Sequence, residues 1–173
     1  LWRWIKGTST FNANGIYGTK GVADVANNPG GRYYGYGGII NDKFYMFGGF
    51  GFGVAGGYGQ LNDLWEFDTN TNNWRWLTGI NATDGLGIYG TLQTYSSTNT
   101  PSSRRTFTGA IGNGTLYVFG GFGNSQSPGG GQLNDLWEYD PTINQWRWLK
   151  GQTNINNIGV YGNVGVASAS SLP

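Results

Sequence analysis

Apolar and polar residues alternate in short runs along the whole chain, without the three-to-four-residue spacing of an amphipathic helix. One run covers 64–67 and another covers 74–77, and a polar turn at 68–72 separates them. Alternation with a period of two is typical of β-strands that bury one face. The pattern therefore predicts an all-β fold.

Both runs return 72 positions later, at 136–139 and 146–149, so that Trp137 stands where Trp65 stood. A third, partial copy opens the chain at 1–5. A fixed period of this length is the signature of a repeat architecture, in which each copy is one supersecondary unit.

Each repeat is predicted to hold four strands, which in the first copy lie at about 33–40, 43–48, 63–67 and 74–77. The first two are separated by two polar residues and are expected to form a β-hairpin. A Gly-rich loop is predicted between the second and third strands, at 50–60 and again at 122–132.

Several markers recur in the same order in both copies. They are a Gly-Gly doublet, an aromatic–Asp pair and a following Trp: Gly48-Gly49, Phe67-Asp68 and Trp74, then Gly120-Gly121, Tyr139-Asp140 and Trp146. In these markers the chain resembles the kelch-repeat family, and its long period resembles the galactose-oxidase-like kelch arrays of microbial surface proteins. The resemblance implies blades of a β-propeller, each a four-stranded antiparallel sheet.

On this resemblance the chain is expected to be a segment of a larger propeller or array. It consists of the last strand of a preceding blade (1–5), two blades (32–77 and 104–149) and three connections (6–31, 78–103 and 150–173). Two blades cannot close a ring, so further blades of the same or identical chains are expected as partners.

An antiparallel hairpin at 63–77 places Glu66 opposite Arg75 and Trp65 opposite Trp76, and the second copy repeats this at 138 and 147. We expect these pairs to be scaffold, because they recur in every blade; a Trp-Arg-Trp platform for a cation or a sugar is the alternative. The positions interpreted as structural are Trp65, Trp74, Trp76, Trp137, Trp146, Trp148, Glu66, Arg75, Glu138, Arg147, Gly48, Gly49, Gly120 and Gly121.

Four further repeated charges, Arg32, Arg104, Asp63 and Asp135, are predicted to be buried partners of loop backbone rather than ligands. The turn at 68–72 resembles a calcium loop superficially, but it lacks the required Gly and Glu. No metal site is therefore expected.

The amino-acid composition limits the classes of partner that the protein is expected to bind. Charged residues make up 11% of the chain and the net charge is +1, which argues against nucleic acid as a partner. No apolar run approaches 18 residues, so no membrane span is expected.

Cys and His are both absent. Their absence excludes thiolate nucleophiles, imidazole-dependent triads and Cys or His zinc sites. Galactose oxidase, a copper enzyme on a kelch propeller, depends on His ligands and a Tyr–Cys crosslink that this chain cannot supply. Six of the nine acids are repeat-structural. We therefore expect no enzyme activity and no cofactor.

Short turns are expected on one face of the blades, and long loops rich in Gly, Tyr, Ser and Asn on the other. Such loops are typical of adaptable binding surfaces. The predicted contact residues are Phe50, Phe52, Tyr58, Tyr89, Tyr95 and Phe122. The alternative is that the long connections, with Tyr17, Tyr89 and Tyr161, pack over their own neighbouring blades.

Asn81 and Asn113 each begin an N-x-S/T sequon, which favours a secreted glycoprotein. The sequence thus predicts a non-enzymatic protein with a structural or adhesive role outside the cell or at its surface. It is expected to contact proteins or glycans, and one form of this prediction makes it part of a polymeric surface assembly. The alternatives are an intracellular, cytoplasmic kelch adaptor for a protein partner, or a non-catalytic part of a propeller enzyme.

Overall fold

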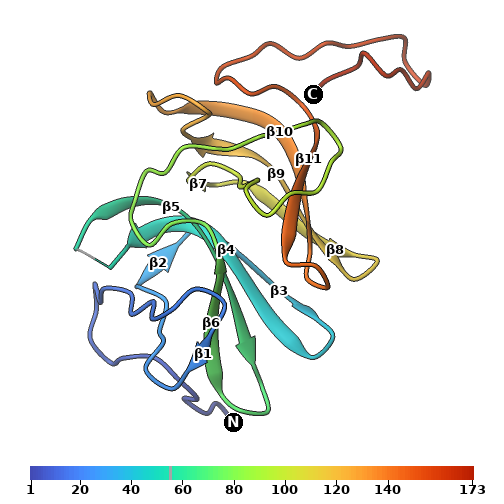
Figure 1. Cartoon of the computed structure of the whole chain (residues 1–173). Coiled ribbons are helices and arrows are strands. Elements are labelled where there is room, and N and C mark those ends of the chain that lie inside the picture. Colours follow the sequence, from blue (N-terminus) through green and yellow to red (C-terminus); the bar gives the residue numbers. More distant parts are fainter. Residues whose placement is uncertain (55) are drawn as a thin grey trace.

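The computed structural model describes residues 1–54 and 56–173, and its regular elements are all β-strands in two antiparallel sheets (Figure 1). The first sheet contains β1 (Ala23–Asp24), β2 (Arg32–Tyr33), β3 (Tyr36–Ile40), β4 (Lys43–Phe52), β5 (Tyr58–Asp68) and β6 (Asn73–Thr78). The second contains β7 (Arg104–Arg105), β8 (Thr108–Gly112), β9 (Thr115–Gly123), β10 (Gly131–Asp140) and β11 (Gln145–Lys150). The all-β prediction is confirmed.

Each sheet contains one blade with the same strand order, and in the first sheet the short strand β1 also pairs with the outer strand β6. In blade 1, β2 and β3 form a broken inner strand on β4, followed by β5 and β6. In blade 2, β7 and β8 pair with β9, followed by β10 and β11. The inner strand breaks at equivalent residues, Tyr34 and Thr106, which both adopt a left-handed conformation (φ 56° and 53°). The four-stranded blade is thus built twice by the same backbone device.

The predicted cross-strand register is confirmed in both outer hairpins. Glu66 lies opposite Arg75 and Trp65 opposite Trp76 on β5 and β6. The same pairs recur on β10 and β11, where Glu138 faces Arg147.

The Gly-rich loop predicted at 50–60 is wrong in its extent. The strands β4 and β5 remain paired from Gly49 to Phe52 and from Tyr58 to Leu61, beyond a register shift at the Gly-Gly doublet. Gly48 and Gly49 both have positive φ (61° and 101°), which glycine adopts without steric cost. They form a β-bulge through which the ladder continues, and β9 and β10 do the same.

Residues 1–5 are expected to form a strand, but they make no strand pairing in this structure and are exposed. A strand needs a neighbour for its backbone hydrogen bonds. Among the described residues, none is paired with this segment.

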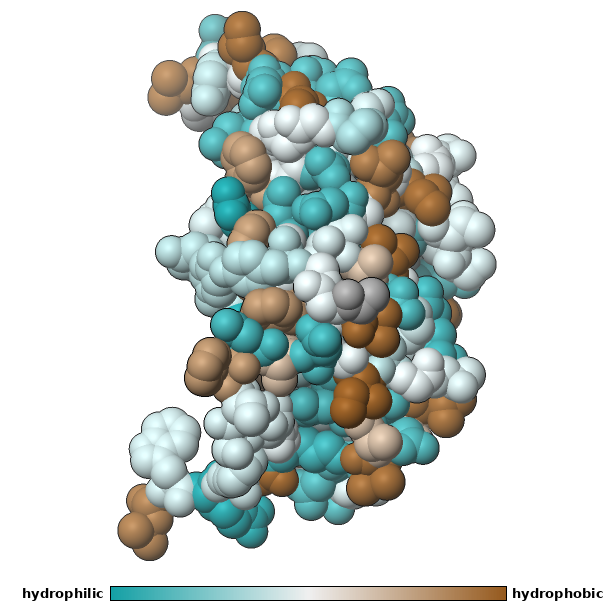
Figure 2. Space-filling view, turned by 90° about the vertical axis from the view of Figure 1, so that its left-hand side faces the viewer, coloured by the Kyte–Doolittle hydropathy of each residue, from teal (hydrophilic) through white to brown (hydrophobic). Residues whose placement is uncertain are grey.

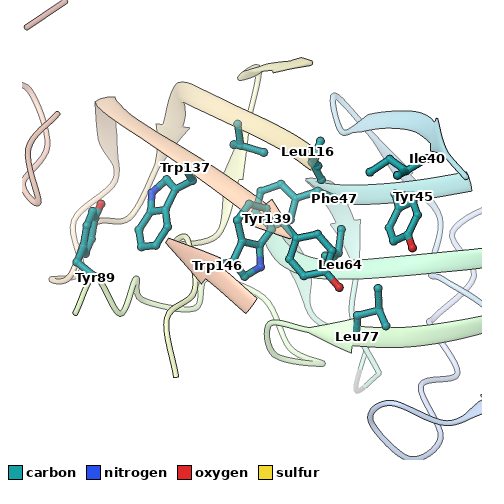
Figure 3. Close-up of a cluster of buried hydrophobic side chains, with 11 residues drawn as sticks. Ile40, Tyr45, Phe47, Leu64, Leu77, Tyr89, Leu116, Trp137, Tyr139 and Trp146 are labelled. Atoms are coloured by element: carbon teal, nitrogen blue, oxygen red, sulfur yellow. The ribbon is translucent and has the colours of Figure 1, made fainter. Parts of the chain in front are cut away.

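The core lies between the two blades. It combines side chains from β3, β4, β5 and β6 with side chains from β9, β10 and β11, and Figure 3 shows them facing each other. Its members are Ile40, Tyr45, Phe47, Leu64, Leu77, Tyr89, Leu116, Val118, Trp137, Tyr139 and Trp146.

Trp146 is the side chain that joins the blades. It is fully buried, its ring lies 5.2 Å from that of Phe47, and its Nε1 donates to Thr78 Oγ1 at 2.9 Å. Trp74, at the equivalent position of blade 1, is only half-buried, because the described residues contain no further blade to cover that side. The geometry favours the structural interpretation of the Trp-Arg-Trp runs over the ligand platform.

The turns and loops segregate as expected. In Figure 1 the short turns at 41–42 and 112–114 lie on the right, whereas the loops after β4 and β9 project to the left. We call the left-hand side, which carries residues 50–60 and 122–132, the loop face.

Candidate binding surface

The long connections are held by a buried network at the end of each blade. Tyr89, from the connection at 78–103, donates its hydroxyl to Asp135 Oδ2 at 2.7 Å. The same oxygen accepts from Trp137 Nε1, and the carboxylate receives two bonds from Arg104, at 2.7 and 2.8 Å. Blade 1 repeats the arrangement with Tyr17 and Asp63, at 2.6 Å.

The charges in this network stabilise each other. Burial by itself would raise the pKa of Asp135, but the positive charge and hydrogen bonds of Arg104, with bonds from Trp137 and Tyr89, hold it below its usual range. Burial and the neighbouring Asp135 carboxylate raise the pKa of Tyr89. Arg104 also donates to the carbonyl of Gly120 at 3.0 Å, so its expected role toward backbone is confirmed in part.

Tyr89 therefore does not belong to a contact surface, and that prediction is wrong. It is 5% exposed and wedged between Trp137 and Trp148, with ring centroids 4.9 and 5.3 Å away. Tyr17 is buried in the same way against Trp65 and Trp76. The connections at 6–31 and 78–103 thus pack on the blades that they enter, which is the alternative stated for Tyr17 and Tyr89.

Tyr161 is the exception among the three equivalent tyrosines. It is 85% exposed, because the described residues contain no third blade for it to enter.

Aromatic side chains from β2, β4 and β5 gather at the loop-face end of blade 1. Tyr33 lies opposite Phe50 on paired strands, and Phe52 lies opposite Tyr58. Ring centroids are 5.7 Å apart for Tyr33 and Phe50, 4.7 Å for Phe50 and Tyr58, and 4.8 Å for Phe52 and Tyr58. Tyr34 packs edge-on against Tyr33 at 4.7 Å.

We call Tyr33, Tyr34, Phe50, Phe52 and Tyr58 the aromatic cluster. Its three tyrosines are exposed, by 46%, 60% and 53% for Tyr33, Tyr34 and Tyr58. The hydroxyls of Tyr33 and Tyr58 are hydrogen-bonded at 3.0 Å, and this bond raises the pKa of Tyr33. Because most of the cluster stands on paired strands, its side chains are held in place before a partner arrives.

Arg105 joins the cluster from blade 2. Its guanidinium carbon lies 4.6 Å from the ring centre of Phe50 and 5.2 Å from that of Phe122. The two predicted contact residues Phe50 and Phe122 are therefore brought together around a cation. Figure 2, a view onto the side that faces left in Figure 1, shows apolar side chains in separate groups among polar ones.

Tyr95 lies elsewhere, on the outer edge of blade 2. Arg147 stacks on its ring at 4.5 Å, and burial together with the charge of Glu138 raises the pKa of Tyr95 to about 12. The structure does not bring Tyr95 into the aromatic cluster. The sequon residues Asn81 and Asn113 are both exposed, one in a connection and one in a hairpin turn.

The two repeats are an internal comparison for what the fold requires. Scaffold residues such as Trp65, Glu66 and Asp63 recur 72 positions later without change. The aromatic cluster does not: Tyr33, Tyr34, Phe52 and Tyr58 are replaced by Arg105, Thr106, Asn124 and Gly130. Of the five rings, only Phe50 recurs, as Phe122. Blade 2 folds without the other four, so the blade does not need them.

Sequence reasoning missed Tyr33, Tyr34 and Arg105, because it placed contact residues only in loops. All three lie in or beside the inner strand. A position-by-position comparison of the two repeats would have found them, as exposed positions where an otherwise regular repeat changes.

No metal centre is indicated. The described residues contain no group of three or more His, Cys, Asp or Glu side chains that could hold an ion. No helix in the described part of the chain is long and apolar enough to cross a membrane.

Comparison with known proteins agrees with the fold. Residues 103–147 match the family described as Kelch motif. Among solved structures, that of YjhT matches with a TM-score of 0.54 and 18% sequence identity over 74% of this chain. The match covers 40% of the YjhT chain. No curated protein is detectably similar. At this identity the structural likeness shows the fold alone.

Proposed function

We propose that this chain, whose residues 103–147 match the Kelch motif and whose sheets are folded as β-propeller blades, is a non-enzymatic structural or adhesive protein of the cell surface. It contacts a protein or glycan partner through the aromatic cluster on its loop face. The observation that carries this proposal is the asymmetry between the blades: exposed rings gather on blade 1 at positions where blade 2 folds without them. Exposed aromatic groups of this kind are typical of contact sites.

The placement of the acids supports a non-catalytic role. Asp63 and Asp135 are bound by arginines in the buried networks, and Glu66 and Glu138 are ion-paired with Arg75 and Arg147. A carboxylate engaged in this way is a poor general acid or base for a bound substrate. The proposal requires no cofactor.

Exposure of both sequons and the low content of charge support the extracellular placement. Asn81 and Asn113 are accessible to a glycosyltransferase, as modification at such sites requires.

Further blades are the other partners that we propose. In blade 1, Phe47 and Thr78 hold Trp146 of the next blade. The equivalent residues of blade 2, Phe119 and Lys150, line an open hollow with Asn134, Leu136 and Pro173. A blade with a tryptophan equivalent to Trp146 would fill it, from the same or an identical chain.

Two measurements on the source organism test this function. Intact cells are treated with a membrane-impermeant amine-reactive biotin reagent, and fluorescently labelled protein is added to isolated cell envelopes. We expect biotin on the protein before lysis and saturable envelope binding that protease or periodate treatment of the envelopes abolishes. Labelling only after lysis would contradict the surface location, and absence of saturable binding would contradict the adhesive role.

A further inference from the structure

Arg105 differs from the other four arginines of the two blades. Arg32, Arg75, Arg104 and Arg147 each form an ion pair with a carboxylate. Arg105 makes no side-chain hydrogen bond or ion pair with any residue that the structure describes, and it is only half-buried. Its charge is therefore stabilised by rings and solvent alone.

Two aromatic rings lie beside this guanidinium, and none of its N–H donors bonds to a residue that the structure describes. Phe50 and Phe122 approach the guanidinium carbon at 4.6 and 5.2 Å, where the ring quadrupoles attract a cation. A guanidinium carries its N–H donors in its own plane, and a carboxylate can accept two of them in parallel. Stacking also restricts the side chain before binding, which lowers the entropy cost of forming those bonds.

Polar groups of blade 1 lie beside the same rings. The Tyr33 and Tyr58 side chains, which pack against Phe50, are exposed, and among the described residues their hydroxyls bond only to each other. Because each hydroxyl carries one proton, one of the two remains free to donate to an acceptor on a partner.

The arrangement of the rings favours a peptide over a sugar. A pyranose stacks on a flat, open aromatic face, but three of the four ring pairs meet at steep angles: 60° for Tyr33 and Phe50, 82° for Phe50 and Tyr58, and 65° for Tyr33 and Tyr34. The fourth pair, Phe52 and Tyr58, is inclined by 38°. Rings at such angles do not form one continuous flat platform for a sugar, whereas individual apolar side chains next to a charged one can pack against them.

We propose that Arg105, held between Phe50 and Phe122, binds an Asp or Glu side chain of a protein partner. An apolar residue beside that acid packs among Tyr33, Tyr34 and Tyr58. The inference rests on the proposed function, because it names the class of partner that the aromatic cluster contacts.

The repeat supplies a substitution that the blade tolerates. Arg105 of β7 is equivalent to Tyr33 of β2, so Arg105→Tyr introduces the residue that the other blade carries at this position. Arg105→Lys retains the charge but loses the planar pair of donors, and serves as a second variant. Arg3→Gln removes an exposed arginine at the N-terminal end and is the matched control.

The probe is an N-acetylated, C-amidated Gly-Glu-Phe-Gly peptide, compared with its Gly-Gln-Phe-Gly counterpart. Each is titrated into isotope-labelled protein while the Nε–H signal of Arg105 is followed by NMR. We expect the Glu peptide to shift this signal saturably and to bind about tenfold more tightly than the Gln peptide, the difference that a charge-assisted pair provides. The Arg105→Tyr variant lacks this side-chain signal, so its backbone amide signals are followed instead. This variant should lose the preference for the Glu peptide. Arg105→Lys should weaken it, and Arg3→Gln should retain it.

Equal binding of the two peptides, absence of binding at millimolar concentration, or an unchanged preference in Arg105→Tyr would overturn the inference. Saturable binding of a neutral oligosaccharide such as cellohexaose at the same signals, in place of the Glu peptide, would overturn it in favour of a glycan. If labelled Arg105→Tyr protein binds envelopes as the parent does, the inference fails while the proposed function stands. If the parent itself does not bind envelopes, the proposed function fails.

Discussion

The hydroxyl of Tyr17 donates to Asp63 Oδ2 across 46 residues of chain, at 2.6 Å, and Tyr89 repeats this bond to Asp135 at 2.7 Å. Each bond fastens a long connection to the third strand of the blade that the connection enters. A long segment without secondary structure is unusual in a compact fold. Here the bond, with two tryptophan rings around each tyrosine, explains why the connection is ordered.

Replacing Tyr89 by Phe removes the hydroxyl but leaves the ring between Trp137 and Trp148. The bond is buried and its acceptor is charged, so we expect a loss of about 1.5–3 kcal/mol in the free energy of unfolding. Urea denaturation followed by tryptophan fluorescence measures this. Tyr161→Phe is the control, because Tyr161 is the equivalent residue without a blade to enter, and it should change stability little. An equal loss in both variants would contradict the role of the bond.

Acid should destabilise the blades through the same network. The folded-state pKa of Asp135 is depressed, as are those of Glu66 and Glu138, where bonds and charges from neighbouring residues outweigh the effect of burial. A depressed pKa contributes stability that is fully present above the unfolded pKa values, about 3.9 for Asp and 4.3 for Glu. That contribution is lost as the pH falls through the lower folded values.

We therefore expect nearly constant stability from these groups between pH 7 and about pH 5, and a decline below about pH 4. Asp135→Asn should cost about 3–5 kcal/mol at pH 7, because it leaves Arg104 buried without its counter-charge. Its acid decline should be shallower than that of the parent. Urea midpoints at pH 7, 5 and 3 measure both effects, and parallel pH profiles in the two proteins would contradict the assignment.

Trp146 should contribute much more to stability than its equivalent in blade 1. Trp146→Ala empties a fully buried site between the blades and should cost about 3–5 kcal/mol. Trp74→Ala acts at a half-buried ring that no second blade covers, so a smaller loss is expected. Thermal unfolding of the two variants decides this, and equal losses would mean that the interface between the blades is not the main core.

The period of 72 residues predicted the fold well, because scaffold positions must recur in every blade. It located the paired strands, their register and the outer hairpins with Glu66 opposite Arg75. It could not locate contacts between segments distant in sequence, such as Tyr17 with Asp63, since no local pattern encodes them.

The candidate surface was predicted only in part. Phe50, Phe52, Tyr58 and Phe122 do lie together on the loop face, whereas Tyr89 is buried and Tyr95 lies apart. The error at Tyr89 has a physical cause. A tyrosine in a Gly-rich connection is expected to be exposed, and the sequence does not show that its hydroxyl bonds to the buried Asp135 carboxylate. Arg105 was missed because it lies in the inner strand β7, whereas contact residues were expected only in loops.

The central claim is that the aromatic cluster serves binding and not folding. Replacing two of its exposed rings, as Tyr34→Thr and Tyr58→Thr, tests it most directly. Thr106 already occupies the left-handed conformation of Tyr34 in blade 2, and Thr retains strand propensity at position 58 of β5.

The measurement is made on the double variant and the parent side by side: the urea midpoint of unfolding and the affinity for isolated cell envelopes. We expect the free energy of unfolding to change by no more than about 1 kcal/mol, as at exposed positions, while envelope affinity falls at least tenfold. A variant that unfolds much more easily than the parent, or that binds envelopes equally well, would contradict the claim that these rings are there for a partner.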